Sequence, residues 1–429
     1  MREVINPPQS EWAGLCGRPT QPWDSIEPLV REVFTQVERD GDQALRTLTQ
    51  KFDGVKLTSV FAAILSEKTE AKQLAPDLKA AIDTAYCNIR TFHCVQSSLV
   101  GGKVETQLGV ICWREPRAIE RVGLYVPGGS APLISTMLML GVPAQLAGCR
   151  DVVVCTPPGK NGSVDPGIRY AAAKCGIRRL YMLGGAQAVA AMTVGTASVP
   201  KVDKIFGPGN QYVTAAKEYA RRYGVAMDMP AGPSEVLVLA DKTARADFVA
   251  ADLLSQAEHG PDSQVVVVTN SRQLQNEVKN ELNRQIRLLE RSEIAAAALQ
   301  NSLSIFCRGM TKCMSFANAY APEHLILQVA DAKAWAKQVI NAGSVFVGQY
   351  TPESAGDYAS GTNHTLPTAG WARTSSGLSV SDFQKTVSFQ AITPAGLNRL
   401  APAIQTLAAA EGLTAHARAV SIRQPEKNL

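Results

Sequence analysis

Short β-rich runs alternate with alanine-rich helical segments along most of this chain, and this alternation limits the folds available to it. The first series of β-rich runs comprises residues 122–126, 151–155, 180–183 and 225–227, each followed by a turn that contains glycine. The second series comprises residues 236–239, 265–268, 325–327 and 344–347, separated by helical segments such as residues 247–258. Strands separated by helices favour βαβ units, in which parallel strands lie side by side. The chain is therefore predicted to be an α/β protein with mostly parallel sheets.

The length of the chain and the two strand series together predict more than one domain. A chain of 429 residues exceeds the size at which a single hydrophobic core usually stops growing. The first hundred residues are mainly helical, because Ile26, Val30 and Val33 recur at helical spacing. We predict two incomplete Rossmann-like α/β domains, a small N-terminal arm and a C-terminal helical tail. The arm is residues 1–25, the first domain is residues 26–119 together with 236–378, the second domain is residues 120–235, and the tail is residues 379–429.

Charge and cysteine content exclude several classes of protein. The 43 basic and 38 acidic residues give a net charge of +5 and are spread along the chain, so no basic block predicts binding to nucleic acid or to a membrane surface. No N-terminal stretch resembles a signal peptide, and no apolar run approaches the roughly 18–20 residues that a membrane span needs. The nine cysteines include no C-x-x-C pair, which indicates reduced thiols. We expect a cytoplasmic protein that acts on a small neutral or zwitterionic molecule.

Four glycine-rich turns are candidate nucleotide-binding segments. They lie at residues 127–130, 184–187, 207–210 and 231–234. Glycine after a strand lets backbone N–H groups approach a ligand, and a helix that starts there presents its positive end to a phosphate. The G-x-G-x-x-G pattern is incomplete, because Tyr212 stands where the third glycine would fall. A dinucleotide bound in an unusual way and a set of ordinary βα turns are both compatible with this pattern.

Four of the five histidines stand in polar surroundings next to turns, and these are His259, His324, His364 and His416. His93 instead ends an amphipathic helix and is expected to be structural. Gln256 and His259 are three residues apart on a predicted last helical turn, so both side chains leave one face of the helix. With Asp357 and His416 they offer nitrogen and oxygen ligands, which suit zinc better than calcium or magnesium. Glutamine is an uncommon ligand, so a metal-free polar turn is the alternative.

Glu323 and His324 form a second candidate site. They follow Pro322 and directly precede the apolar residues 325–327, so they stand at the mouth of a predicted strand. Open α/β sheets place their chemistry at strand ends. An imidazole is suited to take a proton from an alcohol near neutral pH, and a carboxylate can activate water for attack on an aldehyde. A solvated acid and imidazole without a catalytic role is the alternative explanation.

Five segments of this sequence resemble the histidinol dehydrogenase family. They are GLYVPGG at residues 123–129, KIFGPGN at 204–210, DMPAGPSE at 228–235, LLSQAEHGP at 253–261 and ESAGDYASGTNH at 353–364. The resemblance extends from about residue 24 to residue 423. It implies an enzyme of histidine biosynthesis that oxidises L-histidinol to L-histidine in two NAD-dependent steps, through bound L-histidinal. One zinc ion per subunit is implied to orient the substrate.

The resemblance also implies a specific set of site residues, transferred position by position. The implied zinc ligands are Gln256, His259, Asp357 and His416. The implied acid/base residues are Glu323 and His324. The implied substrate contacts are Ser234, Gln256, His259, His324, Asp357, His364, Glu411 and His416. The implied contacts to the nicotinamide nucleotide are Tyr125, Gln187 and Asn210.

A mechanism and an assembly follow from the same resemblance. His324 would take the proton of the substrate hydroxyl, and Glu323 would help water add to the aldehyde. No cysteine stands beside a strand-end histidine or a polar turn, so water rather than a thiolate is expected to attack the aldehyde. A homodimer is implied in which the C-terminal tail, with Glu411 and His416, completes the active site of the neighbouring subunit.

Two other functions are compatible with the same scaffold. One is a related zinc- and NAD-dependent dehydrogenase of another small polar alcohol, such as a sulfonated diol. The other is a catalytically silent protein that binds histidine or NAD. The presence of His364, Glu411 and His416 disfavours the first alternative. The adjacent Glu323 and His324 disfavour the second.

Overall fold

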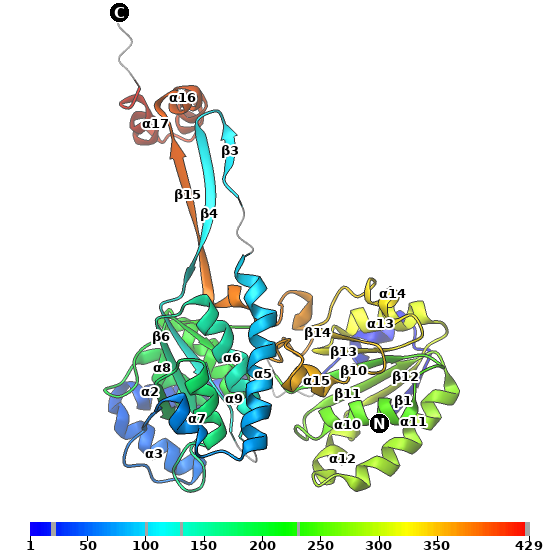
Figure 1. Cartoon of the computed structure of the whole chain (residues 1–429). Coiled ribbons are helices and arrows are strands. Elements are labelled where there is room, and N and C mark those ends of the chain that lie inside the picture. The colour runs from blue at the N-terminus through cyan, green and yellow to red at the C-terminus, as the bar shows by residue number, and fades with distance from the viewer. Residues whose placement is uncertain (19–22, 99–101, 129–131, 230–231, 425–429) are drawn as a thin grey trace, which may run out of the picture.

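Two α/β lobes and a long projecting arm make up the molecule (Figure 1). The computed structural model describes residues 1–18, 23–98, 102–128, 132–229 and 232–424. Of these, we call residues 23–98, 119–229 and 378–383 the first lobe, residues 1–18 and 232–377 the second lobe, and residues 102–118 and 384–424 the arm. The predicted α/β class with mostly parallel sheets is confirmed. Within the described parts of the chain, every helix lacks the length or the apolar character that a membrane crossing requires.

The first lobe is built on a six-stranded sheet in the order β2-β7-β6-β5-β8-β9. Its strands are β2 (Phe61–Ala63), β5 (Arg121–Tyr125), β6 (Asp151–Thr156), β7 (Arg179–Met182), β8 (Lys204–Phe206) and β9 (Ala226–Met227). Neighbouring strands are parallel except β2, which runs antiparallel to β7. Its helices are α2 (Trp23–Asp40), α3 (Asp42–Asp53), α4 (Glu67–Ala71), α5 (Pro76–Cys94), α6 (Ile134–Ala147), α7 (Pro166–Lys174), α8 (Gly185–Val194) and α9 (Gln211–Ala220).

The structure differs from the prediction that residues 26–119 share a domain with residues 236–378. Strand β2 pairs with β7 of the first lobe, and α2 packs against α8 and α9. The buried ring of Phe34 on α2 has its centroid 4.8 Å from that of Tyr219 on α9. The apolar stripe of a helix shows which face is buried but not which sheet covers it. The helical spacing therefore could not assign α2 to a lobe.

The second lobe is built on a six-stranded parallel sheet in the order β1-β12-β11-β10-β13-β14. Its strands are β1 (Arg2–Ile5), β10 (Glu235–Ala240), β11 (Gln264–Thr269), β12 (Leu303–Phe306), β13 (His324–Gln328) and β14 (Ser344–Val347). Its helices are α1 (Trp12–Leu15), α10 (Ala246–Ala257), α11 (Arg272–Gln285), α12 (Ser292–Gln300), α13 (Met310–Tyr320), α14 (Ala332–Ala336) and α15 (Glu353–Tyr358).

Helices cover both faces of this second sheet, which explains the composition of its strands. Leu237 and Leu239 of β10 lie in one hydrophobic core, whereas Val236 and Val238 lie in the other. Successive side chains of a strand point to opposite faces, so each face of the sheet has its own core. A strand that is buried on both faces is a continuous apolar run rather than an alternation of polar and apolar residues.

Residues 1–18 belong to the second lobe and are not the separate arm that we expected at residues 1–25. Strand β1 pairs in parallel with β12, with Arg2 opposite Leu303. Trp12 is buried in the second lobe, and its ring lies nearly perpendicular to that of Phe316 at a centroid distance of 5.4 Å. A strand of four residues is too short for the period of two to be detected in the sequence.

The arm is a three-stranded antiparallel sheet that carries two helices at its far end (Figure 1). Its elements are β3 (Val104–Gln107), β4 (Val110–Ala118), β15 (Gln384–Ile392), α16 (Pro394–Ala410) and α17 (Thr414–Ser421). Strands β4 and β15 pair along nine residues each. The predicted tail at residues 379–429 thus contains the expected helices, but it also supplies a long strand. That strand pairs with a segment far away in the sequence, so no local pattern revealed the arm.

The segment after α15 joins the second lobe to the first. Asn363 Nδ2 donates a hydrogen bond of 2.7 Å to Met139 O in α6, and Asn88 Nδ2 in α5 donates one of 2.8 Å to Ala359 O. Asn363 also lies 3.4 Å from the ring of His93, which is buried. These contacts hold the residues just before His364 against the first lobe.

Candidate active site

The second lobe gathers its candidate site residues at the amino ends of β10 and β13. Glu235 begins β10, His324 begins β13, and the next residue of β10 pairs with His324. Helix α10 runs back from the other edge of the sheet and ends beside this edge, which brings Gln256 close. The strand mouth predicted for Glu323 and His324 is therefore at the amino edge, whereas open α/β sheets usually bind ligands at the carboxyl edge.

Glu323 and His324 are both buried, at 5% and 3% exposure, and both are held by Glu235. The N–H of Glu235 donates to Glu323 Oε2 at 2.9 Å. The Nδ1 atom of His324 lies 3.2 Å from the carbonyl oxygen of Glu235. A carbonyl oxygen can only accept, so Nδ1 carries a proton in this contact and Nε2 is the nitrogen that can gain or lose one. Burial alone would lower the pKa of His324, but the neighbouring carboxylates of Glu323, Glu353 and Asp357 outweigh this effect and raise that pKa well above its ordinary value.

Helix α15 brings two carboxylates to the ring of His324. Asp357 Oδ1 lies 3.4 Å from Nε2 of His324, and Glu353 Oε1 lies 3.9 Å from Nδ1. One potential ligand atom from each of His324, Glu353 and Asp357 lies within 4.8 Å of the other two. Glu353 was not predicted as a site residue. A signal was present, because residues four apart on a helix share a face and Asp357 was already a candidate.

Gln256 and His259 lie together at the end of α10, which packs against α15. Gln256 is fully buried, and its Nε2 atom lies 3.3 Å from Nδ1 of His259. His364 is half-buried between the lobes, with Nδ1 at 2.9 Å from Asp357 O and Nε2 at 3.1 Å from Thr136 Oγ1. The structure therefore brings Gln256, His259, Asp357 and His364 to one edge of the second lobe.

Several buried polar atoms of this cluster have no hydrogen-bond partner among the described residues. They are Oε1 of Gln256, Nε2 of His324 and both carboxylate oxygens of Glu353. An unpartnered buried polar atom costs about 1–3 kcal/mol, and such atoms are uncommon in folded proteins. Their concentration at one place indicates that a metal ion or a polar ligand completes the site. The available atoms are nitrogen and oxygen, a donor set that fits zinc.

Burial and mutual contact displace the pKa values of these groups. Burial raises the pKa of Glu323 to about 8 and raises that of Glu353 well above its ordinary value. Burial alone would raise the pKa of Asp357 too, but the contact with His324 outweighs it and lowers that pKa. Buried acid and imidazole groups with displaced pKa values are typical of catalytic sites. The cluster therefore offers both proton donors and proton acceptors near neutral pH.

The three expected nucleotide contacts lie at the carboxyl edge of the first sheet. Tyr125 ends β5 and accepts a hydrogen bond of 3.0 Å from the N–H of Gly185. Gln187 on α8 is buried, with Nε2 at 3.4 Å from Asp53 Oδ2. Asn210 is exposed and caps α9, where its side chain accepts from Val213 N at 3.1 Å. Residues 129–131 and 230–231, within two of the glycine-rich turns, lie outside the described residues.

The other three expected substrate or metal contacts are Ser234, Glu411 and His416. Ser234 directly precedes β10, and its carbonyl oxygen accepts a bond of 3.2 Å from Gln264 N. It thus neighbours the catalytic candidates through Glu235. Glu411 and His416 are exposed at the far end of the arm, in the turn before α17 and in α17 itself (Figure 1). Within one chain, the arm therefore does not bring Glu411 or His416 to the other site residues.

Comparison with known proteins identifies the family of this chain. A sequence model of histidinol dehydrogenase matches residues 16–424. Histidinol dehydrogenase of Bacteroides thetaiotaomicron is 52% identical over 425 residues, and the match covers 99% of both chains. Histidinol dehydrogenase of Xylella fastidiosa (strain Temecula1) is 51% identical over 427 residues, and the match covers 98% of this chain and 99% of the other. The crystal structure of histidinol dehydrogenase from Elizabethkingia anophelis has a TM-score of 0.94 at 49% identity, covering 99% of this chain and 98% of that one. The resemblance noted in the sequence is thereby confirmed, and this chain belongs to the histidinol dehydrogenase family.

Proposed function

We propose that this enzyme oxidises L-histidinol to L-histidine in two NAD-dependent steps, with zinc bound at the edge of the second lobe. Membership of the family makes the chain an oxidoreductase of histidine biosynthesis. The observation that carries the residue assignments is the meeting of Glu323, His324 and Asp357 in one buried cluster. An acid/base pair beside a carboxylate that can bind metal is what an alcohol and aldehyde oxidation needs.

Gln256, His259 and Asp357 would hold the zinc ion within one subunit. The unpartnered Oε1 of Gln256 supports this assignment, because a ligand to a cation would satisfy that buried oxygen. When bound, zinc would hold the imidazole and amino nitrogens of the substrate and so orient its carbinol carbon. His364, which is held by Thr136 and by the carbonyl oxygen of Asp357, would contact the substrate beside the metal.

His324 would remove the hydroxyl proton of the substrate in the first oxidation. The contact between its Nδ1 and the carbonyl oxygen of Glu235 leaves Nε2 as the basic nitrogen. Once Nε2 is protonated, the carboxylate of Asp357 at 3.4 Å stabilises the charged ring. The ring can therefore accept a proton without turning.

Glu323 would activate water for addition to the aldehyde before the second oxidation. One carboxylate oxygen accepts from Glu235 N, so the side chain is fixed in direction while its other oxygen can take a proton. Burial raises the pKa of Glu323 to about 8, which makes the ionised carboxylate a stronger base than one in water. A strong base is needed because water itself is a weak nucleophile.

Tyr125, Gln187 and Asn210 would contact the nicotinamide nucleotide, which accepts the hydride in each oxidation. Burial raises the pKa of Tyr125 to about 12, so its phenol keeps its proton. Because the hydroxyl oxygen already accepts from Gly185 N, the hydroxyl hydrogen is left for a ligand. The exposed Asn210 at the start of α9 lies where a helix amino end favours a phosphate.

Glu411 and His416 would act in the neighbouring subunit of a homodimer. Both are exposed on an arm that extends away from the lobes of its own chain (Figure 1). The end of the arm also exposes Leu407 and Leu413, apolar side chains suited to contact with a partner. In a twofold dimer each arm would complete the other subunit's site, and His416 would add the fourth zinc ligand.

Separate assays with two substrates test this function against that of the related dehydrogenases. The purified enzyme with zinc and NAD is incubated with L-histidinol, and NADH absorbance is followed. The same measurement with a sulfonated diol is the control for the alternative alcohol substrate. NADH formation from L-histidinol alone supports the proposal. Turnover of the diol but not of L-histidinol, or NAD binding without turnover of either, would overturn it.

A further inference from the structure

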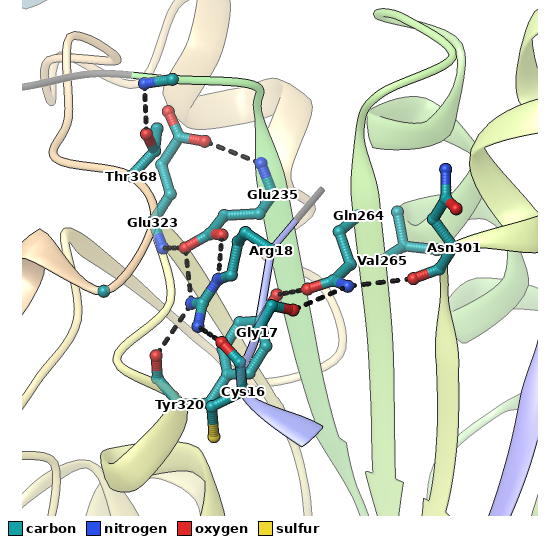
Figure 2. Close-up of polar contacts among 12 residues, drawn as sticks. Cys16, Gly17, Arg18, Glu235, Gln264, Val265, Asn301, Tyr320, Glu323 and Thr368 are labelled. Atoms are coloured by element: carbon teal, nitrogen blue, oxygen red, sulfur yellow. Dashed lines mark hydrogen bonds and ion pairs between the residues drawn. The ribbon is translucent and has the colours of Figure 1, made fainter. Parts of the chain in front are cut away.

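The N-terminal segment places the side chain of Arg18 against Glu235, which in turn contacts Glu323 (Figure 2). Only 8% of the Arg18 side chain is exposed. Its Nε and Nη2 atoms donate to the two carboxylate oxygens of Glu235 at 2.7 and 2.9 Å. Nη2 also donates to Tyr320 O at 2.8 Å, and Nη1 donates to Cys16 O at 2.5 Å. The guanidinium is thus fixed by four hydrogen bonds and has no freedom to turn.

Glu235 connects this arginine to both members of the acid/base pair. Its carboxylate Oε1, besides binding Arg18, accepts from the backbone N–H of Glu323 at 3.2 Å. Its own N–H donates to the Glu323 carboxylate at 2.9 Å, and its carbonyl oxygen faces His324 Nδ1 at 3.2 Å. Glu235 therefore holds both the backbone N–H and the carboxylate of Glu323, and its carbonyl oxygen determines which ring nitrogen of His324 faces it with a proton.

The charge of Glu235 requires a partner at this depth. Its side chain is 1% exposed, and an ionised carboxylate without a counter-charge is strongly disfavoured in such surroundings. Arg18 supplies the charge through a planar fork that matches both carboxylate oxygens. Without it, the buried carboxylate would have no counter-charge, and its Oε1 would no longer be held in place for the backbone N–H of Glu323.

The packing around Arg18 fixes the position of this ion pair. Its guanidinium lies 3.6 Å from the centroid of the Tyr320 ring. The hydroxyl of Tyr320 donates to Gln264 Oε1 at 2.7 Å, and Gln264 Nε2 donates to Asn301 O at 2.9 Å (Figure 2). Contacts from β11 and from the residues before β12 therefore anchor the arginine to the central strands of the sheet.

We infer that Arg18 is a positioning residue for Glu323, acting through Glu235. This inference rests on the proposed catalytic roles of Glu323 and His324. It gives the N-terminal segment a part in catalysis, since residues 1–18 deliver the guanidinium to the sheet edge where the reaction takes place. Because two of the three contacts from Glu235 are to Glu323, loss of Arg18 impairs the oxidation of histidinal more than the oxidation of histidinol.

A second buried ion pair in the first lobe provides a matched control. Arg169 Nε and Nη2 donate to the two carboxylate oxygens of Glu70 at 2.9 and 2.7 Å, and Nη2 also donates to Ala63 O at 3.0 Å. Glu70 is fully buried, as Glu235 is, but neither residue of this pair contacts the site residues. Arg169→Met therefore reports what the loss of such a pair does to stability alone.

The experiment compares Arg18→Met, Arg18→Lys and Arg169→Met in the zinc-loaded dimer. The rates of histidinol and histidinal oxidation and the thermal unfolding midpoint are measured for each variant. We expect Arg18→Met to lower kcat for histidinal by about 10- to 100-fold, with a smaller loss for histidinol and an unchanged KM for NAD. Arg18→Lys, which keeps the charge but loses the fork, gives an intermediate loss. Arg169→Met lowers the midpoint and leaves the ratio of the two rates unchanged.

A double variant keeps the test valid if Arg18→Met does not fold. Arg18→Met combined with Glu235→Gln leaves no uncompensated buried charge. If Arg18 acts through Glu235, the loss of histidinal oxidation in the double variant is no greater than the loss in Glu235→Gln alone. Losses that multiply in the double variant would overturn the inference, because they would show independent action.

The remaining outcomes separate this inference from the proposed function. If Arg18→Met behaves as Arg169→Met does, while Glu323→Gln still impairs histidinal oxidation, Arg18 is structural and only the inference is wrong. If Glu323→Gln leaves histidinal oxidation intact, the proposed role of Glu323 is wrong and the inference falls with it.

Discussion

The Nε2 atom of His324 lies 3.4 Å from Oδ1 of Asp357, so the proposed proton acceptor and a proposed zinc ligand are in direct contact. The two come from different elements, β13 and α15, whose relative position is set by the packing of the second lobe. Metal binding at Asp357 and proton transfer at His324 should therefore depend on each other.

Removal of the metal should abolish the activity and lower the thermal stability of the protein. Gln256 Oε1 and the carboxylate of Asp357 would lose their cation, and the buried oxygen would again lack a partner. Chelation followed by addition of zinc should restore both properties. Activity, unfolding midpoint and metal content are measured on the same samples. Full activity in protein that elemental analysis shows to be free of metal would exclude zinc from the mechanism.

Glu323→Gln should impair the oxidation of histidinal more than that of histidinol, whereas His324→Asn should impair both. The reason is that only the second oxidation requires water to be activated, while both steps move a proton at the imidazole. A loss of about 100-fold or more is expected for the affected step, the size typical of a general base. Rates with each substrate added separately decide the matter. Equal losses for Glu323→Gln in the two steps would refute this division of roles.

The rate of histidinal oxidation should rise with pH through about 8. Burial raises the pKa of Glu323 to about 8, so below this pH most molecules carry a protonated carboxyl that cannot accept a proton from water. Above it the carboxylate is ionised and the rate should level off. The pH dependence of kcat is measured for the wild type and for Glu323→Gln. Persistence of the same rise in the variant would show that another group is responsible.

Tyr125→Phe should weaken NAD binding without selecting between the two half-reactions. The variant removes the hydroxyl hydrogen offered to the nucleotide, and it leaves the N–H of Gly185 without its acceptor. A single hydrogen bond corresponds to an increase in KM for NAD of about 3- to 10-fold. Tyr181→Phe, a buried tyrosine on β7 of the same sheet, is the control and should leave KM unchanged. An unaltered KM in Tyr125→Phe would remove this residue from the nucleotide site.

Mixed dimers should recover activity from two nearly inactive variants. A Glu323→Gln subunit and a His416→Ala subunit damage different halves of a shared site, so a mixed dimer has one intact site and one doubly damaged site. Random reassembly makes about half of the dimers mixed, and the expected recovery is roughly a quarter of wild-type activity. Mass spectrometry confirms that mixed dimers have formed. No recovery in their presence would place His416 and Glu323 in the same subunit's site.

The central strands and the family of this chain could be predicted from the sequence. The valines of β11 and residues 325–327 of β13 are continuous apolar segments, and such segments are detected locally. The motif that contains Asp357 carried the family resemblance. Local patterns of this kind predict strands, helices and candidate site residues, but they do not predict which of those residues contact one another in the folded protein.

What the sequence could not give was the set of long-range contacts. Strand β15 pairs with β4 across most of the chain length, so nothing near either strand indicates the arm. Arg18 and Glu235 are 217 positions apart in the sequence. A single arginine forms no sequence pattern from which its partner could be predicted. Glu353 was visible as a neighbour of Asp357 on one helix face, but its contact with His324 depends on how α15 packs against β13.

The most direct test of this account is the stoichiometry of a single complete reaction. A limiting, known amount of L-histidinol is added to the zinc-loaded enzyme with excess NAD, and NADH and the amino-acid product are both quantified. Two NADH and one L-histidine per L-histidinol are predicted, with no free histidinal accumulating, because both oxidations use the same buried pair, Glu323 and His324. One NADH per L-histidinol with release of the aldehyde would contradict the account.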